Sequence, residues 1–253
     1  MLRRGDHGVY RRRSGAISYG YEWGTIMLDF DSPFVPGDMG NAATYKGHTL
    51  FSSVPGLSVR AILGDEEGKF QQAVISAAQE LVANGAHAIT SNCGFMIRYQ
   101  SAVARAVPDR PVILSSLVQL PVIAAITAPH SPIGIITADS KTLTSAFIER
   151  EFPNVGNRVR IAGLEQSPSF KRTMFDGHDE LDADAICKET VDAASRLLQA
   201  DPEMRMLLLE CAALPAYASS IQAAWPDVLV YDFTTAMSLV DVARDRTPFH
   251  GHY

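Results

Sequence analysis

The stretch His87-Ala-Ile-Thr-Ser-Asn-Cys-Gly-Phe95 decides the fold, because it joins a short apolar run to a polar loop that carries a cysteine. The stretch Met206-Leu-Leu-Leu-Glu-Cys-Ala-Ala-Leu-Pro215 has the same design. Such apolar runs are typical of buried strands in a parallel sheet. Ligands of parallel α/β sheets bind at the carboxyl ends of the strands, which is where both cysteines stand. The two stretches therefore predict a parallel α/β protein with one cysteine at the ligand-binding edge of each half.

The rest of the chain repeats the order of strand and helix, which predicts parallel sheets with right-handed crossovers. The predicted strands span 24–30, 57–63, 87–91, 112–115, 133–137, 158–162, 206–209 and 228–231. The predicted helices span 66–84, 117–127, 141–151, 182–200, 215–224 and 234–244. Because the two halves are similar and no linker rich in Pro, Gly or Ser divides them, we expect two packed lobes that meet near 129–132.

Composition and charge favour a globular protein. The chain has 253 residues, of which 47% are hydrophobic and 20% charged, and its formal net charge is −6. This balance gives no reason to expect nucleic acid as a partner. No uncharged apolar stretch reaches the roughly 18 to 20 residues that span a bilayer, so we expect no membrane partner.

The first twenty residues contain five arginines and one aspartate. The stretch that follows these arginines, residues 14–22, is too polar for a secretory signal. We interpret residues 1–20 as a loosely held basic extension and expect a cytoplasmic protein.

Cys93 and Cys211 form a symmetric pair, 118 residues apart, or close to half the chain. Inverting a carbon acid requires one base on one face of the carbon and one acid on the other. A thiol suits both roles, since its ordinary pKa of about 8.5 falls at a helix N-terminus. Cys187 differs, because it lies on one apolar stripe of a predicted helix, and we expect it in the core.

These motifs resemble those of the aspartate/glutamate/hydantoin racemase superfamily, over residues 24 to 240. The stretches Thr90–Phe95 and Leu209–Tyr217 are similar to its two catalytic loops. Pro36–Asn41 with Thr44, Ser115–Pro121 and Ile136–Asp139 support the likeness.

The resemblance implies an α/β fold of two three-layer lobes related by a pseudo-twofold axis, with the active site in the cleft between them. It implies a first lobe at 21–128 and 227–253 and a second lobe at 129–226. It also implies chemistry without a cofactor or metal, carried by Cys93 and Cys211, and a homo-oligomer.

The loops depart from the family pattern, because Gly94, Phe95, Ala212 and Ala213 stand where polar side chains are common. Backbone N–H groups can still hold a carboxylate. We therefore expect a substrate less polar than aspartate or glutamate. The loop residue Asn92 completes this group of predicted substrate-binding residues.

Other polar residues have more than one interpretation. Ser115 and Thr137 end predicted strands and can donate to a substrate carboxylate, and Thr44 is a further substrate-binding candidate. The segment 37–41 is either an anion-binding nest or a plain turn. Thr234 and Thr235 are expected to cap the last helix. We expect Glu210 to point away from Cys211, since a carboxylate raises the pKa of a neighbouring thiol.

Several other chemistries have no support in the sequence. It lacks the phosphate-loop, dinucleotide-binding, serine-hydrolase and zinc-protease motifs. The histidines show no metal-binding spacing outside the C-terminal end.

The functional hypothesis is a cofactor-independent racemase or epimerase of a small carboxylate-bearing compound, such as an amino acid or a hydantoin. One alternative is an enzyme on the same fold that resembles arylmalonate decarboxylases or maleate isomerases, in which a cysteine protonates a carbanion or adds to a double bond. Another is a non-catalytic relative that binds a small molecule.

Overall fold

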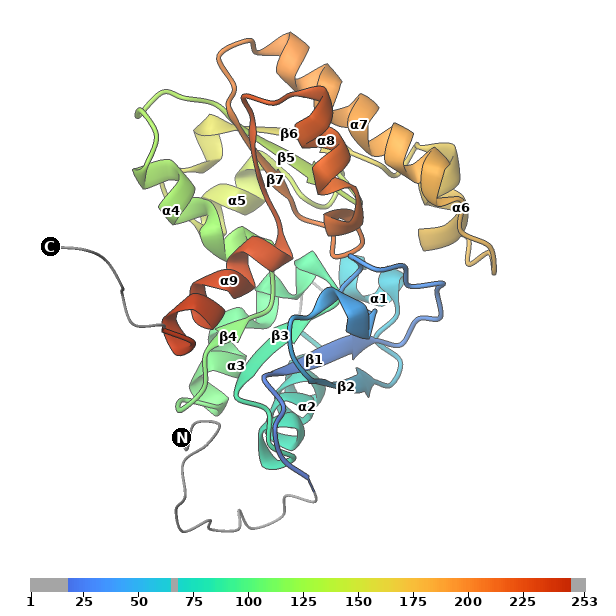
Figure 1. Cartoon of the computed structure of the whole chain (residues 1–253), viewed down its shortest axis with the longest axis vertical. Helices are drawn as coiled ribbons and strands as arrows, with labels where there is room; N and C mark the ends of the chain where they lie inside the picture. Colours follow the sequence, from blue (N-terminus) through green and yellow to red (C-terminus); the bar gives the residue numbers. More distant parts are fainter. Residues whose placement is uncertain (1–17, 65–67, 247–253) are drawn as a thin grey trace, which may run out of the picture.

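The computed structural model describes residues 18–64 and 68–246, which form two lobes, each around a four-stranded parallel sheet (Figure 1). The strand orders are β2-β1-β3-β4 and β6-β5-β7-β8, so the sheets share one topology. The first sheet contains β1 (Trp23–Leu28), β2 (Thr49–Val54), β3 (Ala88–Ser91) and β4 (Val112–Ile113). The second contains β5 (Ile133–Thr137), β6 (Val159–Gly163), β7 (Met206–Leu209) and β8 (Leu229–Tyr231). The predicted two-lobed α/β fold is confirmed.

Helices cover both faces of each sheet, which explains why β3 and β5 are buried along their whole length. In the first lobe, α2 (Gln71–Ala83) packs on β1, β2 and β3. The opposite face receives α9 (Phe233–Arg244), whose Phe233 and Met237 share a buried cluster with Trp23 and Ala88.

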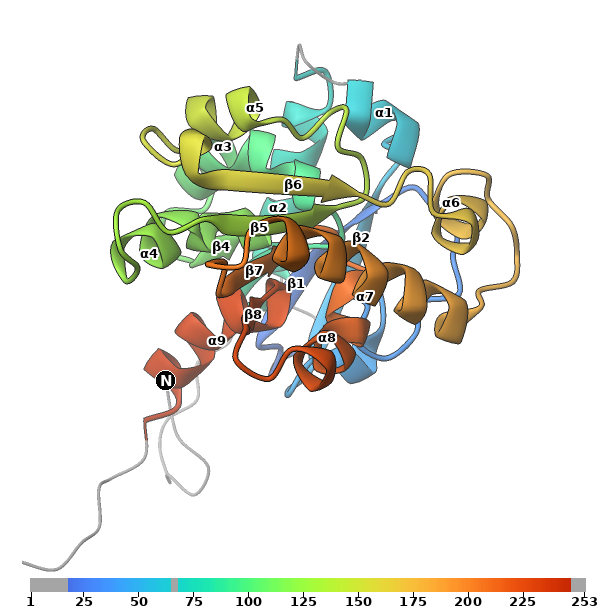
Figure 2. The same cartoon turned by 90° about the horizontal axis from the view of Figure 1, so that it is seen from above.

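The second lobe is layered in the same way. Figure 2 shows α5 (Ser145–Glu151) on one side of its sheet and α7 (Ala183–Ala200) with α8 (Ala218–Ala224) on the other. The other α-helices are α1 (Val59–Gly64), α3 (Gln100–Ala106), α4 (Leu120–Ala125) and α6 (Pro168–Met174). The 3-10 helices are η1 (Ala42–Thr44), η2 (Gly94–Tyr99), η3 (Ser116–Gln119), η4 (Gly156–Arg158) and η5 (Leu214–Tyr217).

The two lobes share equivalent backbone hydrogen bonds as well as the same strand order. The backbone N–H of Asn92 donates to the carbonyl of Ile26 at 3.1 Å, where the chain leaves β3. The N–H of Glu210 donates to the carbonyl of Ile136 at 2.8 Å, where the chain leaves β7. The cysteine that follows each of these residues therefore occupies an equivalent position in its lobe.

The predicted strand at 57–63 is wrong. The second strand of the lobe is β2 at 49–54, and the apolar residues that follow form α1. Ser58 starts this helix, because its side chain accepts a hydrogen bond from the N–H of Ala61 at 3.2 Å. The run is too short for its periodicity to separate a strand from one turn of a buried helix.

The predicted lobe boundary at residue 227 is also placed too early. Strand β8 pairs in parallel with β7 and so completes the second sheet. The chain leaves the second lobe after this strand and enters α9. Most of the predicted basic extension at 1–20 lies outside the described residues.

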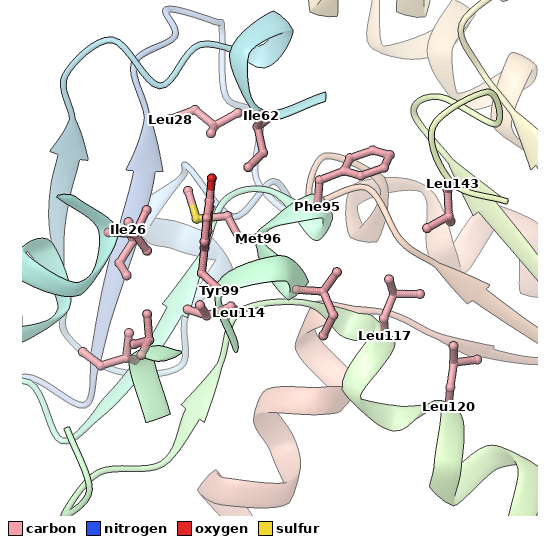
Figure 3. Packing of buried hydrophobic residues seen from close by; sticks show 14 of the residues in the cluster. Ile26, Leu28, Ile62, Phe95, Met96, Tyr99, Leu114, Leu117, Leu120 and Leu143 are labelled. Atoms are coloured by element: carbon pink, nitrogen blue, oxygen red, sulfur yellow. The ribbon is translucent and has the colours of Figure 1, made fainter. Parts of the chain in front are cut away.

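One hydrophobic cluster runs from the first lobe into the second (Figure 3). It includes Ile26 on β1 and Ile62 on α1, and it continues through Phe95 and Leu117 to Leu143 before α5. All five side chains are buried. The loop that follows the first cysteine is therefore packed into a core that both lobes share.

The joint before α9 is held by a capping box. The Asp232 side chain accepts a hydrogen bond from the N–H of Thr235, and the Thr235 hydroxyl oxygen accepts one from the N–H of Asp232. Gln119 of η3 donates to the carbonyl of Asp232 at 2.9 Å and accepts from the Thr235 hydroxyl at 2.9 Å. This network ties the crossing chain to the first lobe.

We predict that Asp232→Ala lowers the free energy of unfolding by about 1 kcal/mol, because α9 loses its N-cap acceptor. Urea denaturation of the wild type and the variant measures this difference. The matched control is Asp227→Ala, since Asp227 is exposed in the turn before β8. Equal unfolding midpoints for all three proteins would contradict the prediction.

Candidate active site

A pocket lies where the carboxyl ends of β1, β3, β5 and β7 face one another between the lobes. The first lobe lines it with the loops after β1 and β3 and with α1. The second lobe contributes the loops after β5 and β7 and helix α6. The pocket is small, with a cavity volume of about 60 Å³. Its position is the one expected for a ligand site of parallel α/β sheets.

Cys93 and Cys211 both line this pocket, one from each lobe. Cys93 is the N-cap residue of η2, and the backbone N–H groups of Phe95 and Met96 face its thiol closely enough to lower its pKa in part. Cys211 accepts from the N–H of Ala213. The structure thus brings together the two thiols that the sequence singled out.

Both thiols are harder to ionise than the sequence led us to expect. Burial raises the pKa of Cys93 to about 12, and the nearby carboxyl of Glu210 adds to this shift. The same two causes raise the pKa of Cys211 well above its ordinary value. The N–H groups of Phe95 and Met96 lower the pKa of Cys93 as expected, but burial first and the Glu210 carboxyl second outweigh them.

Glu210 lines the pocket, so the expectation that it points away is wrong. Its Oε2 accepts a hydrogen bond from the hydroxyl of Thr137 at 2.8 Å, whereas its Oε1 is buried without a hydrogen-bond partner. Burial raises the pKa of this carboxyl to about 7, although the Thr137 hydroxyl and the N–H of Ala138 lower it in part. A second titratable group therefore stands beside the thiols.

Asp38 joins the two thiols and Glu210 as a titratable group of the pocket, and no pattern in the sequence singled it out. It is buried, and its Oδ1 accepts from the N–H of Gly40 at 2.7 Å. Burial raises the pKa of this carboxyl to about 7. The segment 37–41 is a turn, because Gly37 has a φ of 102° and Asn41 caps η1. The turn carries a carboxylate into the pocket, which is the opposite of an anion-binding nest.

The rest of the lining is apolar and rich in aromatic rings. The residues that line the pocket, within the described part of the chain, include no lysine, arginine or histidine. The negative charge of the carboxyls is therefore not balanced by a cationic side chain in the wall. The aromatic residues are Phe30, Phe34, Phe95, Phe170 and Phe175.

Four of the predicted substrate-binding residues line the pocket, namely Asn92, Gly94, Phe95 and Ala213. Gly94 is required sterically, because a Cβ at this position would overlap the Oε1 and the carbonyl oxygen of Glu210. The absence of a side chain here makes room for the carboxyl of the other lobe.

Four others do not line it and support its surroundings instead. Thr137 reaches the site only through its hydrogen bond to Glu210. Ser115 caps η3, and Thr44 bonds the backbone on either side of Asp38. Ala212 is buried, and its carbonyl accepts from the N–H of Met39 at 3.1 Å.

The remaining candidates have structural roles. Thr234 and Thr235 were expected to cap the last helix, but the N-cap of α9 is Asp232. Thr235 completes its capping box, and the Thr234 hydroxyl donates to the Asp232 side chain. Cys187 packs against the core of the second lobe, as expected. Across residues 18–64 and 68–246, no group of three or more His, Cys, Asp or Glu side chains is placed to hold a metal ion. Within the same ranges, no helix is long and apolar enough to cross a membrane.

Curated proteins similar to this chain are named as lyases. Dimethylsulfoniopropionate lyase 7 of Emiliania huxleyi (strain CCMP1516) is 30% identical over 210 residues, which are 79% of this chain and 61% of that protein. Dimethylsulfoniopropionate lyase 3 of the same strain is 30% identical over 79% of this chain and 54% of its own length. A dimethylsulfoniopropionate lyase of Durusdinium sp. clade D is 26% identical, over 83% of this chain and 70% of that protein. The chain thus spans little more than half the length of the two Emiliania proteins. No family model matches the sequence.

Solved structures with the same fold include racemases and a decarboxylase. Glutamate racemase from Bacillus anthracis aligns with a TM-score of 0.57 and 15% identity, over 88% of this chain and 82% of that one. The Gly74Cys mutant of arylmalonate decarboxylase has a TM-score of 0.55 and 14% identity, over 88% and 92%. Allantoin racemase from Pseudomonas fluorescens has a TM-score of 0.53 and 15% identity, over 88% and 91%.

The hypothesis of a racemase or epimerase is corrected by the curated relatives, which carry the name of a lyase. That name favours the alternative interpretation, in which the fold carries a different reaction. The error arose because the cysteine pair and its strand context indicated the fold and did not specify the reaction. The chain has the fold of the aspartate/glutamate/hydantoin racemase superfamily, as its motifs indicated.

Proposed function

We propose that this chain is a lyase that cleaves a small sulfonium carboxylate, and that dimethylsulfoniopropionate is its substrate. The observation that carries the proposal is the composition of the pocket, which combines two thiols and two carboxyls with aromatic walls. The names of the relatives supply the substrate.

The charge of the pocket supports a cationic substrate group. A dicarboxylate would bring negative charge to Asp38 and Glu210, where no cationic side chain of the described wall offsets it. A dimethylsulfonium group is positive and carries two methyl groups, so it suits both a carboxylate and the faces of phenylalanine rings. Each such cation–π contact contributes about 0.5 to 2 kcal/mol.

The reaction is a β-elimination that one thiolate can drive. The thiolate removes a proton from the carbon next to the substrate carboxylate, and the electron pair of this C–H bond becomes the new C=C bond. The C–S bond breaks, and its electron pair leaves with neutral dimethyl sulfide, so that acrylate remains. A thiolate with a raised pKa is a strong base, but little of such a thiol is ionised at neutral pH, so the step also needs a group that takes the S–H proton.

The substrate carboxylate is held by backbone N–H groups in this proposal. The loops after β3 and β7 turn into 3-10 helices, and they lie at the positions where such N–H groups meet ligands. These donors stabilise the charge that builds on the carboxylate oxygens as the proton leaves.

We predict that purified wild-type protein releases dimethyl sulfide and acrylate in equal amounts from dimethylsulfoniopropionate. Elimination removes one proton and needs one base, so the alanine variants of Cys93 and Cys211 should lose activity unequally. One variant should lose at least about 100-fold in kcat, and the other should retain more of it. Gas chromatography of dimethyl sulfide measures both rates.

The matched control is Cys187→Ala, because this third cysteine lies in the core outside the pocket. It should keep the wild-type rate. Parental rates in both pocket variants would contradict a role for the thiols. A wild type without any dimethyl sulfide release would contradict the substrate.

We predict that Asp38→Asn raises the KM for dimethylsulfoniopropionate by at least about 10-fold, because the sulfonium loses its counter-charge. The asparagine keeps an oxygen that can accept from Gly40. Inhibition by 4-methylpentanoate, an isostere with an uncharged CH group in place of the sulfonium, should change little. Below about pH 7, the KM of the wild type should rise as the carboxyl is protonated, since its pKa is about 7.

The control for this experiment is Asp31→Asn, an exposed carboxyl in the same loop. It should leave both constants unchanged. If Asp38→Asn weakened the sulfonium and the uncharged isostere equally, the loss would be one of shape, and the assignment of Asp38 as the counter-charge would be wrong.

A further inference from the structure

Glu210 presents a buried oxygen that the fold does not use. Its Oε2 is occupied by the Thr137 hydroxyl, while its Oε1 has no hydrogen-bond partner. The residue is 0% exposed and forms part of the pocket wall. A buried carboxyl oxygen without a partner is costly, so its retention calls for a functional reason.

Comparison with the equivalent residue of the first lobe shows which part of Glu210 is needed to anchor its loop and which part is not. At the equivalent position in the first lobe, Asn92 uses its Oδ1 to accept from the N–H of Leu28 at 2.8 Å. Glu210 likewise accepts from the N–H of Ala138, which stands at the matching place after β5. An amide is sufficient to anchor the loop in the first lobe. The negative charge and the free Oε1 of Glu210 are therefore additional to the anchoring.

Oε1 lies beside the residue that follows Cys93, and the carboxyl charge acts on both thiols without a hydrogen bond from Oε1 to either sulfur. Gly94 directly follows Cys93, and its missing side chain leaves the volume that Oε1 fills. Cys211 is the next residue after Glu210. Of all charged groups, the Glu210 carboxyl contributes most to the raised pKa of each thiol.

We propose that Glu210 is a catalytic acid–base residue, whose Oε1 takes the S–H proton of the reacting cysteine when a sulfonium substrate enters the pocket. This role rests on the proposed lyase function. In the first step the S–H bond breaks and an O–H bond forms at Oε1. In the second step the thiolate takes the substrate proton, and dimethyl sulfide leaves with the electron pair of the C–S bond. Glu210 then releases its proton to solvent, and the starting state returns.

The charges around Glu210 favour such a transfer over simple ionisation of a thiol. Asp38 and Asp139 are the other carboxyls that act on the pocket groups, and Arg98 is the cation that partly offsets them at Cys93. With Glu210 ionised, a free thiolate would add a second negative charge to a buried space. Moving the proton from sulfur to Oε1 keeps the total charge constant.

The competing explanation is that Glu210 only suppresses the thiols or only supports the loop. If it suppressed them, its neutral variant would be more active. If it only supported the loop, glutamine would preserve activity, since Asn92 performs that task as an amide. Acid–base catalysis instead predicts that glutamine makes the thiols easier to ionise and the enzyme slower.

The experiment compares Glu210→Gln, Glu210→Asp and the control Glu165→Gln, whose carboxyl binds Ser140 outside the pocket wall. For each protein, kcat for dimethyl sulfide release and the rate of pocket-thiol alkylation by iodoacetamide are measured from pH 5.5 to pH 9. Peptide mass spectrometry identifies the alkylated cysteine.

In Glu210→Gln, we expect kcat to fall at least about 100-fold, while alkylation at neutral pH is as fast as in the wild type or faster. The acid limb of the wild-type kcat profile near pH 7 should disappear in this variant. Glu210→Asp should recover part of kcat, and Glu165→Gln should match the wild type. Unchanged or increased kcat in Glu210→Gln would overturn the proposal, as would an aspartate variant no better than the glutamine one.

Alkylation also separates failure of this proposal from failure of the lyase function, because it needs no turnover. A wild type that releases no dimethyl sulfide would refute the lyase function alone. In that case the alkylation profile decides. If the alkylation rate of the wild type changes its slope near pH 7 and that of Glu210→Gln does not, proton exchange between Glu210 and the thiols is supported. Identical pH profiles of alkylation in the two proteins would overturn the proposal.

Discussion

The two carboxyls and two thiols of the pocket constrain one another, because each ionisation in this buried space raises the cost of the next. Asp38 and Glu210 come from different lobes, as do Cys93 and Cys211, and the described wall holds no cationic side chain. Burial raises the pKa of all four groups, and like charge adds to the shift at Glu210 and at both thiols. A positively charged ligand would reduce the repulsion among these groups. The charge of the pocket is in this way connected with the sulfonium substrate proposed above.

The pseudo-twofold fold explains how such a site can be assembled. Strands β3 and β7 place their following loops in equivalent positions, so each lobe delivers one cysteine and one hydrogen-bonding residue before it. At the position before the cysteine the lobes differ, because the Asn92 side chain accepts from the N–H of Leu28 whereas Glu210 keeps one oxygen without a hydrogen bond. A symmetric scaffold thereby carries an asymmetric site, as a reaction that removes one proton requires.

The sequence predicted the two lobes and both thiols, because short buried strands and the loops after them leave a local pattern in the chain. It did not reveal Asp38, since a carboxylate within a Gly-rich turn looks like any surface turn until the opposite lobe covers it. The strand expected at 57–63 became α1, because a run of seven residues carries too little periodicity to decide. The orientation of Glu210 depended on a contact with Gly94, 116 positions away in sequence. The cysteine pair did not identify the reaction, because racemases and a decarboxylase share this fold.

The close approach of Gly94 to Glu210 has a consequence for how this site can change over evolutionary time. A Cβ at position 94 would overlap both the Oε1 and the backbone carbonyl oxygen of Glu210, so a side chain there requires the facing loops of the two lobes to separate. A shorter residue at 210 would remove only the first overlap, because the carbonyl oxygen stays in place. Position 94 can therefore gain a side chain only together with a change in the spacing of the lobes, and no single substitution at 210 permits it.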